Sequence, residues 1–260
     1  MLGLLCTVSI GTIQFGFSLA SWNVMNSAYT AYYDWGDDAT KNLSLVQSLL
    51  TGGGAVGALG SGSLLRIGRW NCIVITNIVI ILGGGISMIP GLGWVCIGRF
   101  LTGLGVGAFT VFCPKYIIET APISVRGPAG SLTSIGICTG ILISFTIGVF
   151  FPEVEDGSES SQLTLIIIVL GFPILMALIQ LTLMFTVYPY DTPPYLFQND
   201  KKASLEALFA KIYRQPDMEQ LTAELRPDQE NTAQRPGTLK SFTDPLYRKA
   251  SFVGCVTALA

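Results

Sequence analysis

The chain has 260 residues, of which 50% are hydrophobic and only 12% are charged, with a net charge of −2. A soluble domain carries about 25% charged residues, so this composition excludes an ordinary soluble protein and indicates an integral membrane protein. The small net charge gives no reason to expect a nucleic-acid partner, and the absence of histidine excludes imidazole catalysis and histidine metal sites. The six cysteines lie scattered in apolar runs without CxxC spacing, which favours buried small hydrophobes over a disulfide framework or a zinc site.

Six apolar segments are long enough to cross a membrane, because a helix needs roughly 20 apolar residues to span the hydrocarbon core. Lipid forces such segments to be helical, since their backbone groups find no water to hydrogen-bond. The sequence therefore predicts an all-α membrane protein with a six-helix transmembrane bundle, followed by short cytoplasmic helices. The predicted spans cover residues 2–26, 43–65, 72–90, 93–112, 128–151 and 163–187.

Basic residues in the short loops predict the orientation of the bundle. Arg66 and Arg69 follow the second span, and Lys115 and Arg126 lie between the fourth and fifth spans. The opposite side has Lys41 alone among its short loops, together with several acids. The positive-inside rule therefore places both ends of the six-span unit in the cytoplasm.

The same orientation turns one sequence motif outward. Asn42, Leu43 and Ser44 form an N-glycosylation sequon in the loop after the first span. The sequon lies close to the predicted membrane and such triplets are common by chance, so an unmodified Asn42 is the alternative. We expect a multi-pass protein in contact with membrane lipid, in the plasma membrane, with its N-terminus and linker in the cytoplasm.

The character of the chain changes after the sixth span. Within residues 199–214, Leu205, Leu208, Phe209 and Ile212 recur at helical spacing, which predicts a short amphipathic helix. An apolar run begins again near residue 247, but about ten apolar residues are too few to span a bilayer. The expected division is a bundle at 1–190, a cytoplasmic helical linker at 191–245 and the truncated start of a seventh span at 246–260.

A glycine-rich run in the second span contains a misleading motif. Gly52, Gly54 and Gly57 spell GxGxxG, which in a dinucleotide site follows a strand and precedes an acidic residue about 20 positions later. Position 77 is Asn77, and the next acidic residue is Glu119. Close packing between helices explains these glycines better than a nucleotide site does, and no cofactor is expected.

One long pattern identifies a family. The stretch GRFLTGLGVGAFTVFCPKYIIETAPISVRG at 98–127 contains P-x-Y-x-x-E-x-x-P-x-x-x-R-G and closely resembles the sugar porters of the major facilitator superfamily, which include the facilitative glucose transporters. The stretches QFGFSLASWN at 14–23, RIGRW at 66–70 and YDTPPYL at 190–196 resemble the same family. The family has twelve spans in two six-span bundles. The resemblance covers nearly the whole chain but only the first half of that architecture, so it implies a missing C-terminal six-span bundle as partner.

The chain departs from the family pattern at several positions. Where the family has Asp and a basic residue in the loop after span two, this chain has Leu65 and Trp70; after span six, Pro194 replaces an Arg. In span five the family commonly has a sugar-binding Gln where this chain has Ser134. Proton-coupled members have an Asp in span one at the position of Ser18, and its absence here favours a facilitator.

The resemblance also implies candidate site residues. It predicts a hexose or related sugar bound between two bundles, with Phe15, Ser18, Asn23, Thr133 and Ser134 as candidate contacts. For each hydroxyl the alternative is a bond to its own helix. The charged residues of the loops are predicted to form a cytoplasmic gate. That set comprises Arg66, Arg69, Glu119, Arg126 and Asp191.

Arg99 is the most informative single residue. An ionisable group inside a membrane span is expected to be functional, and in proton-coupled relatives this Arg opposes the first-span Asp. We predict a substrate-binding role for Arg99, with an anchor at the outer membrane interface as the alternative.

The resulting prediction is a membrane transporter and not an enzyme. It moves a hexose by alternating access, as a facilitator, and this chain represents half of it. Two alternatives of other kinds remain, namely a half-size protein that transports only as a dimer, and a truncated, non-transporting membrane scaffold. A proton-coupled symporter is a further alternative.

Overall fold

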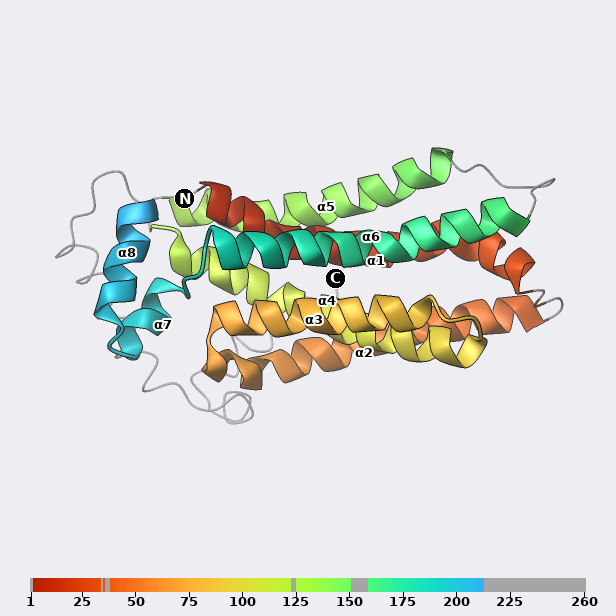
Figure 1. The fold of residues 1–260 in the computed structure, drawn as a ribbon, viewed down its shortest axis with the longest axis horizontal. Helices are drawn as coiled ribbons and strands as arrows, with labels where there is room; N and C mark the ends of the chain where they lie inside the picture. The colour runs from red at the N-terminus through yellow and green to blue at the C-terminus, as the bar shows by residue number, and fades with distance from the viewer. Residues whose placement is uncertain (1, 34, 36–37, 123–124, 151–158, 213–260) are drawn as a thin grey trace, which may run out of the picture. The chain divides into compact units, whose positions relative to one another are not determined.

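The computed structural model describes residues 2–33, 35, 38–122, 125–150 and 159–212. Its described residues contain six helices long and apolar enough to cross a membrane, as the sequence predicts. Figure 1 shows these helices lying side by side along their length. They are α1 (Leu2–Tyr32), α2 (Ala39–Leu64), α3 (Arg69–Ser87), α4 (Leu92–Thr120), α5 (Arg126–Phe150) and α6 (Glu159–Thr186). The all-α fold with six candidate spans is thereby confirmed.

Helix α4 extends eight residues beyond its predicted end at residue 112 and contains Pro114 in its interior. A proline inside a helix removes one hydrogen bond and costs about 3 kcal/mol. Cys113, Tyr116 and Ile117 around this proline are fully buried. Burial of each large apolar side chain contributes about 1.5–3 kcal/mol, so tertiary packing outweighs the cost of the proline.

The six helices pack as two groups of three (Figure 1). Helix α1 packs mainly on α5 and α6, and α4 packs mainly on α2 and α3. The groups meet where α1 contacts α4 and α3 contacts α6. Helices α1, α2 and α3 have the same packing partners as α4, α5 and α6 once the two sets are exchanged: the pair α1–α5 corresponds to α4–α2, and α1–α6 to α4–α3. Such an internal structural repeat is common in transporter bundles.

Glycines bring α2 and α4 into backbone contact. A methyl group added at Gly57 would collide with the backbone of Leu104, and one added at Gly107 would collide with the backbone of Gly54. Gly52 is exposed and faces open space within the described residues. Close packing therefore explains two glycines of the GxGxxG run, whose helical setting in α2 lacks the strand that a dinucleotide site requires.

The chain divides into two compact units, Met1–Tyr195 and Leu196–Ala260. After α6 come the short helix α7 (Pro193–Gln198) and the helix α8 (Lys202–Ile212). Helix α8 confirms the short helix predicted within 199–214, and its apolar residues Leu205, Leu208 and Phe209 are buried. The remaining linker and the proposed start of a seventh span, at 246–260, lie outside the described residues.

Candidate functional site

A cluster of charged and polar side chains joins α3, α4 and the segment after α6. We name it the loop cluster; it consists of Arg69, Glu119, Asp191 and Thr192. The Arg69 guanidinium Nη2 lies 2.9 Å from Glu119 Oε1, and the Thr192 hydroxyl donates to Glu119 Oε2 at 2.7 Å. The Arg69 and Glu119 side chains are only 13% and 16% exposed. Both oxygens of the Glu119 carboxylate therefore have partners from other parts of the chain.

Asp191 caps the start of α3. Its Oδ1 accepts hydrogen bonds from the backbone N–H of Arg69 at 3.0 Å and of Thr192 at 2.7 Å. The residue before α3 is Gly68, which has no side chain to cap the helix, so the carboxylate of Asp191 takes that place. Burial raises the pKa of Asp191, and the backbone N–H groups and the Arg69 charge oppose that rise.

Further bonds fix residues 188–195 against α3 and α4. The Tyr116 hydroxyl donates to the Tyr190 carbonyl at 2.7 Å, and the Trp70 indole N–H donates to the Tyr188 carbonyl at 3.1 Å. Gly68 has a φ of 108°, and a methyl group added there would meet the Asp191 carboxylate and the Tyr195 ring. Only glycine fits that position without strain.

The structure brings three of the five predicted gate residues together, namely Arg69, Glu119 and Asp191. Arg66 is exposed, Arg126 is half-buried, and neither forms an ion pair with another residue that the structure describes. Thr192 was not predicted from the sequence, since a single threonine beside two prolines carries no distinctive signal. The cluster can hold α3, α4 and the segment after α6 together. Its contacts are an ion pair and hydrogen bonds, which a conformational change can break and form again.

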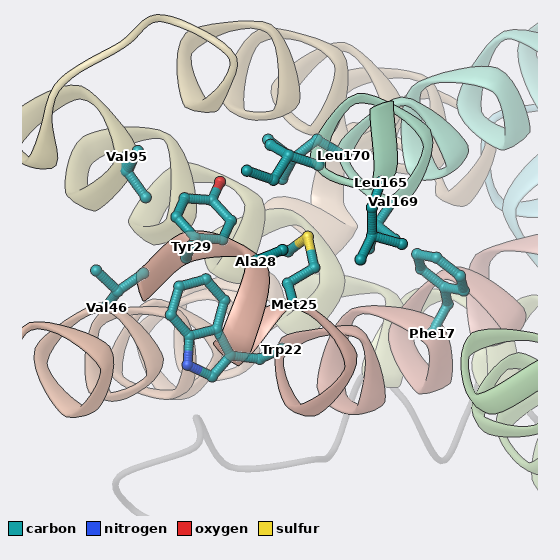
Figure 2. Packing of buried hydrophobic residues seen from close by; sticks show 11 residues of the cluster. Phe17, Trp22, Met25, Ala28, Tyr29, Val46, Val95, Leu165, Val169 and Leu170 are labelled. Carbon is teal, nitrogen blue, oxygen red and sulfur yellow. The ribbon is translucent and has the colours of Figure 1, made fainter. Parts of the chain in front are cut away.

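A second polar region lies inside the bundle around Arg99. This side chain is only 3% exposed, with its guanidinium carbon 4.6 Å from the centre of the Trp22 ring. Arg99 thus lies within the protein and not at the surface of the bundle. Trp22 contacts Tyr29, and Figure 2 shows the two rings next to each other on α1, with Val95 of α4 on the side of Tyr29.

Arg99 lines a small cavity of about 10 Å³ between α1, α3, α4 and α6. That volume holds about one water-sized atom. The predicted contact Ser18 lines the same cavity and is buried. A hexose has no room in this cavity in the conformation described. The polar residues that line it are Ser18, Ser21, Ser87, Arg99 and Thr102.

The other predicted sugar contacts lie on outer faces of α1 and α5. Asn23 and Ser134 are exposed, whereas Phe15 and Thr133 are half-buried. Such positions are available to a second bundle or to a ligand, and the chain alone encloses none of them. Asn42, the predicted glycosylation site, is half-buried in the first turn of α2.

A buried network of amides connects α1, α3 and α6. Gln14 Nε2 lies 3.4 Å from both Asn77 Oδ1 and Gln180 Oε1. Gln180 Nε2 donates to the carbonyl of Thr7 at 3.0 Å, and all three amide residues are fully buried. This network is not among the sequence-based predictions, although an isolated amide within a strongly apolar span indicates that the amide needs a partner.

The comparisons agree with this architecture. The model of the family described as "Sugar (and other) transporter" matches residues 4–260. Hexose transporter 1 of Toxoplasma gondii is 26% identical over 96% of this chain and 48% of its own length. Facilitated glucose transporter member 3 of Gallus gallus is 26% identical over 97% of this chain and 53% of its own.

A solved structure shares the fold. The proton:xylose symporter XylE, bound to 6-bromo-6-deoxy-D-glucose, superposes with a TM-score of 0.77 at 21% identity, covering 94% of this chain and 56% of that one. The chain spans about half the length of the relatives it matches. Since the family model covers almost every residue, this chain belongs to the family described as "Sugar (and other) transporter".

Proposed function

We propose that this chain is the N-terminal six-helix bundle of a transporter that moves a hexose or related sugar by alternating access. Its membership of the sugar transporter family and the transport activities for which its relatives are named support this assignment. The share of each relative that it covers supports a second six-span bundle as the missing partner. The proposed division is a bundle at 1–190, a cytoplasmic linker at 191–245 and the start of a seventh span at 246–260.

The loop cluster is the observation that carries the mechanism. In alternating access, one bundle rocks against the other, and contacts at each end must form and break in every cycle. An ion pair between exposed groups contributes about 0–1 kcal/mol, whereas breaking a buried pair costs about 3–5 kcal/mol. The pair of Arg69 and Glu119 is partly buried and lies between these limits. It would close the cytoplasmic end together with Asp191, and the exposed Arg66 and half-buried Arg126 would meet the second bundle.

The distribution of carboxylates favours a facilitator over a proton symporter. Among the apolar stretches of the six described helices, with α6 counted from Leu163, Glu119 is the only acidic residue, and both its oxygens already have partners. Proton coupling needs a carboxylate that loses and regains a proton during the cycle, and Ser18 cannot supply one. Sugar hydroxyls need neutral hydrogen-bonding groups and an aromatic face, so Phe15, Asn23, Thr133 and Ser134 are the proposed contacts. Arg99 and Ser18 would reach a sugar only if the cavity widened in another conformation.

Uptake of labelled glucose into proteoliposomes tests this function. The protein is reconstituted with its complete coding region, including whatever follows codon 260. Entry that equilibrates without accumulating, unaffected by a proton uncoupler, is the expected result. Accumulation that an uncoupler abolishes would identify a proton symporter instead. A Glu119→Gln variant is expected to slow uptake, and Glu206→Gln, at an exposed residue of α8, serves as the matched loss of charge.

Two other states of the chain are outcomes of the same experiment. Uptake by this chain alone, with crosslinking between copies, would indicate a half-size transporter that works as a dimer. Absence of uptake with and without the downstream region would indicate a non-transporting scaffold. The proposed orientation and plasma-membrane location are tested by expression in animal cells, where removal of N-glycans should shift the wild type and not Asn42→Gln.

A further inference from the structure

We propose that the cavity beside Arg99 binds a small monovalent anion, with chloride as its physiological occupant. The geometry points to this because a buried positive charge and several unused hydrogen-bond donors surround a space of about one atom. The site is formed by Arg99 and Ser18, two of the predicted sugar contacts, in the conformation whose cavity has no room for a sugar. The proposal does not require the transport activity.

The charge on Arg99 has no counter-charge among the residues that the structure describes. Arginine stays protonated in proteins, and an isolated charge in a low-dielectric interior carries a large desolvation cost. Glu119 lies twenty residues further along the same helix, about 30 Å away at 1.5 Å per residue, and Asp38, just before α2, forms no ion pair with Arg99. The Glu119 carboxylate already pairs with Arg69. The Trp22 ring offsets part of the cost through a cation–π contact, but an aromatic face does not neutralise a charge.

Three donors around the cavity are unused. Nε and Nη2 of Arg99 are buried without a hydrogen-bond partner in the described part of the chain, and so is Oγ of Ser18. Other hydroxyls of the lining already donate to backbone carbonyls, as Ser87 does to Gly83 and Thr102 to Gly98. Arg99 and Ser18 both line the cavity, so two guanidinium nitrogens and one hydroxyl without a partner belong to residues around one space.

The size of the cavity selects the class of ligand. At about 10 Å³ it accommodates a single-atom ion or one water, and it excludes phosphate, sulfate and sugars. A water molecule would satisfy the donors but would leave the positive charge uncompensated. A halide accepts all three donors and neutralises the charge, and it needs no donor of its own.

Thermal unfolding of the complete protein in detergent, in chloride or in gluconate at equal ionic strength, gives the first test. A ligand that binds only the folded state raises the unfolding temperature as its concentration rises. Chloride is expected to raise this temperature for the wild type and for Arg66→Gln, an exposed arginine that serves as the charge-matched control. The rise is expected to be absent in Arg99→Gln.

Bromide provides a readout at the site itself. Trp22 is 3% exposed and lies against Arg99, so dissolved bromide reaches its ring poorly by collision. In a protein that retains Trp22 as its only tryptophan, bound bromide is expected to quench fluorescence in a saturable way. Chloride should compete with that quenching. Ser18→Ala is expected to raise the bromide dissociation constant about tenfold, as the loss of one hydrogen bond to a charged group.

One variant keeps the test decisive if Arg99→Gln fails to fold. Ser18→Asp places a carboxylate at the same cavity and should abolish the response to halide while the protein stays folded. Equal unfolding temperatures in chloride and gluconate, or unsaturable quenching of the wild type, would overturn the proposal and leave water as the occupant. A carboxylate of the loop after α1 is the rival counter-ion for Arg99. If replacing Asp34, Asp37 and Asp38 together by Asn created a halide response that the wild type lacks, that rival would be correct and the proposal would be overturned.

Discussion

Replacing Glu119 by Gln removes one charge from the loop cluster and keeps the size of the side chain. The glutamine can accept a bond from Arg69 or from Thr192 with its oxygen, but its NH₂ group then faces the other donor. The lost ion pair lies between exposed pairs, worth about 0.2–1 kcal/mol, and buried pairs, whose disruption costs about 3–5 kcal/mol. With side chains 13% and 16% exposed, we expect a loss of about 2 kcal/mol in the free energy of unfolding.

That loss is measurable by thermal unfolding of the purified protein in detergent. For a chain of this length, about 2 kcal/mol corresponds to a fall of about 4–8 °C in the unfolding temperature. Arg66→Gln removes one charge from an exposed position nearby and is expected to change the temperature by less than about 2 °C. The paired interaction is isolated by a double-mutant cycle with Arg69→Gln. If the two single changes add to within about 0.5 kcal/mol, or if Glu119→Gln matches Arg66→Gln, the assignment of a stabilising pair is refuted.

Three further predictions concern other parts of the bundle. Gly107→Val should separate α2 from α4 and lower the unfolding temperature by several degrees, whereas Gly60→Val, at a glycine facing open space, should not. Because burial raises the pKa of Asp191, the folded state binds its proton more tightly than the unfolded state. Its contribution to stability is complete below the ordinary carboxyl pKa of 3.8 and is lost as the pH rises through the raised value. The wild type should therefore gain stability relative to Asp191→Asn on acidification, and a stability difference between the two that does not change with pH would contradict this reasoning. Gln180→Leu should cost about 1–3 kcal/mol by breaking the buried amide network, and an unchanged unfolding curve would show that these long bonds contribute nothing.

Most of the fold could be predicted from the sequence, because the length of an apolar run and the lack of water in lipid leave only a helix. The ends of the helices were harder to predict. Helix α4 continues past Pro114 because Tyr116 and Ile117 are buried against other helices, and such packing has no local signal. Helix α2 likewise begins at Ala39, four residues before the predicted start of the second span at residue 43.

The candidate site was predictable in composition and not in pairing. Charge and the family pattern predict which loop residues belong to the site. The structure adds that Glu119 pairs with Arg69, whereas Arg66 is exposed to solvent. The choice of partner depends on which helix ends meet. The roles of Thr192 and Gln180 could not be predicted, because hydroxyl and amide side chains are common in sequences. Their hydrogen bonds matter because both residues are buried.

The charge of Arg99, which has no counter-charge in the described part of the chain, has an electrical consequence. Moving one elementary charge across a membrane potential of 100 mV changes the energy by about 2.3 kcal/mol. If rocking of the bundle carried Arg99 through a tenth of that field, the conformational equilibrium would shift by about 0.2 kcal/mol per 100 mV. A bound halide would travel with the arginine as a neutral pair, so the field would do no work on it. Salt composition and voltage would then act on the same equilibrium, and the gating current of the protein would decrease as halide fills the cavity.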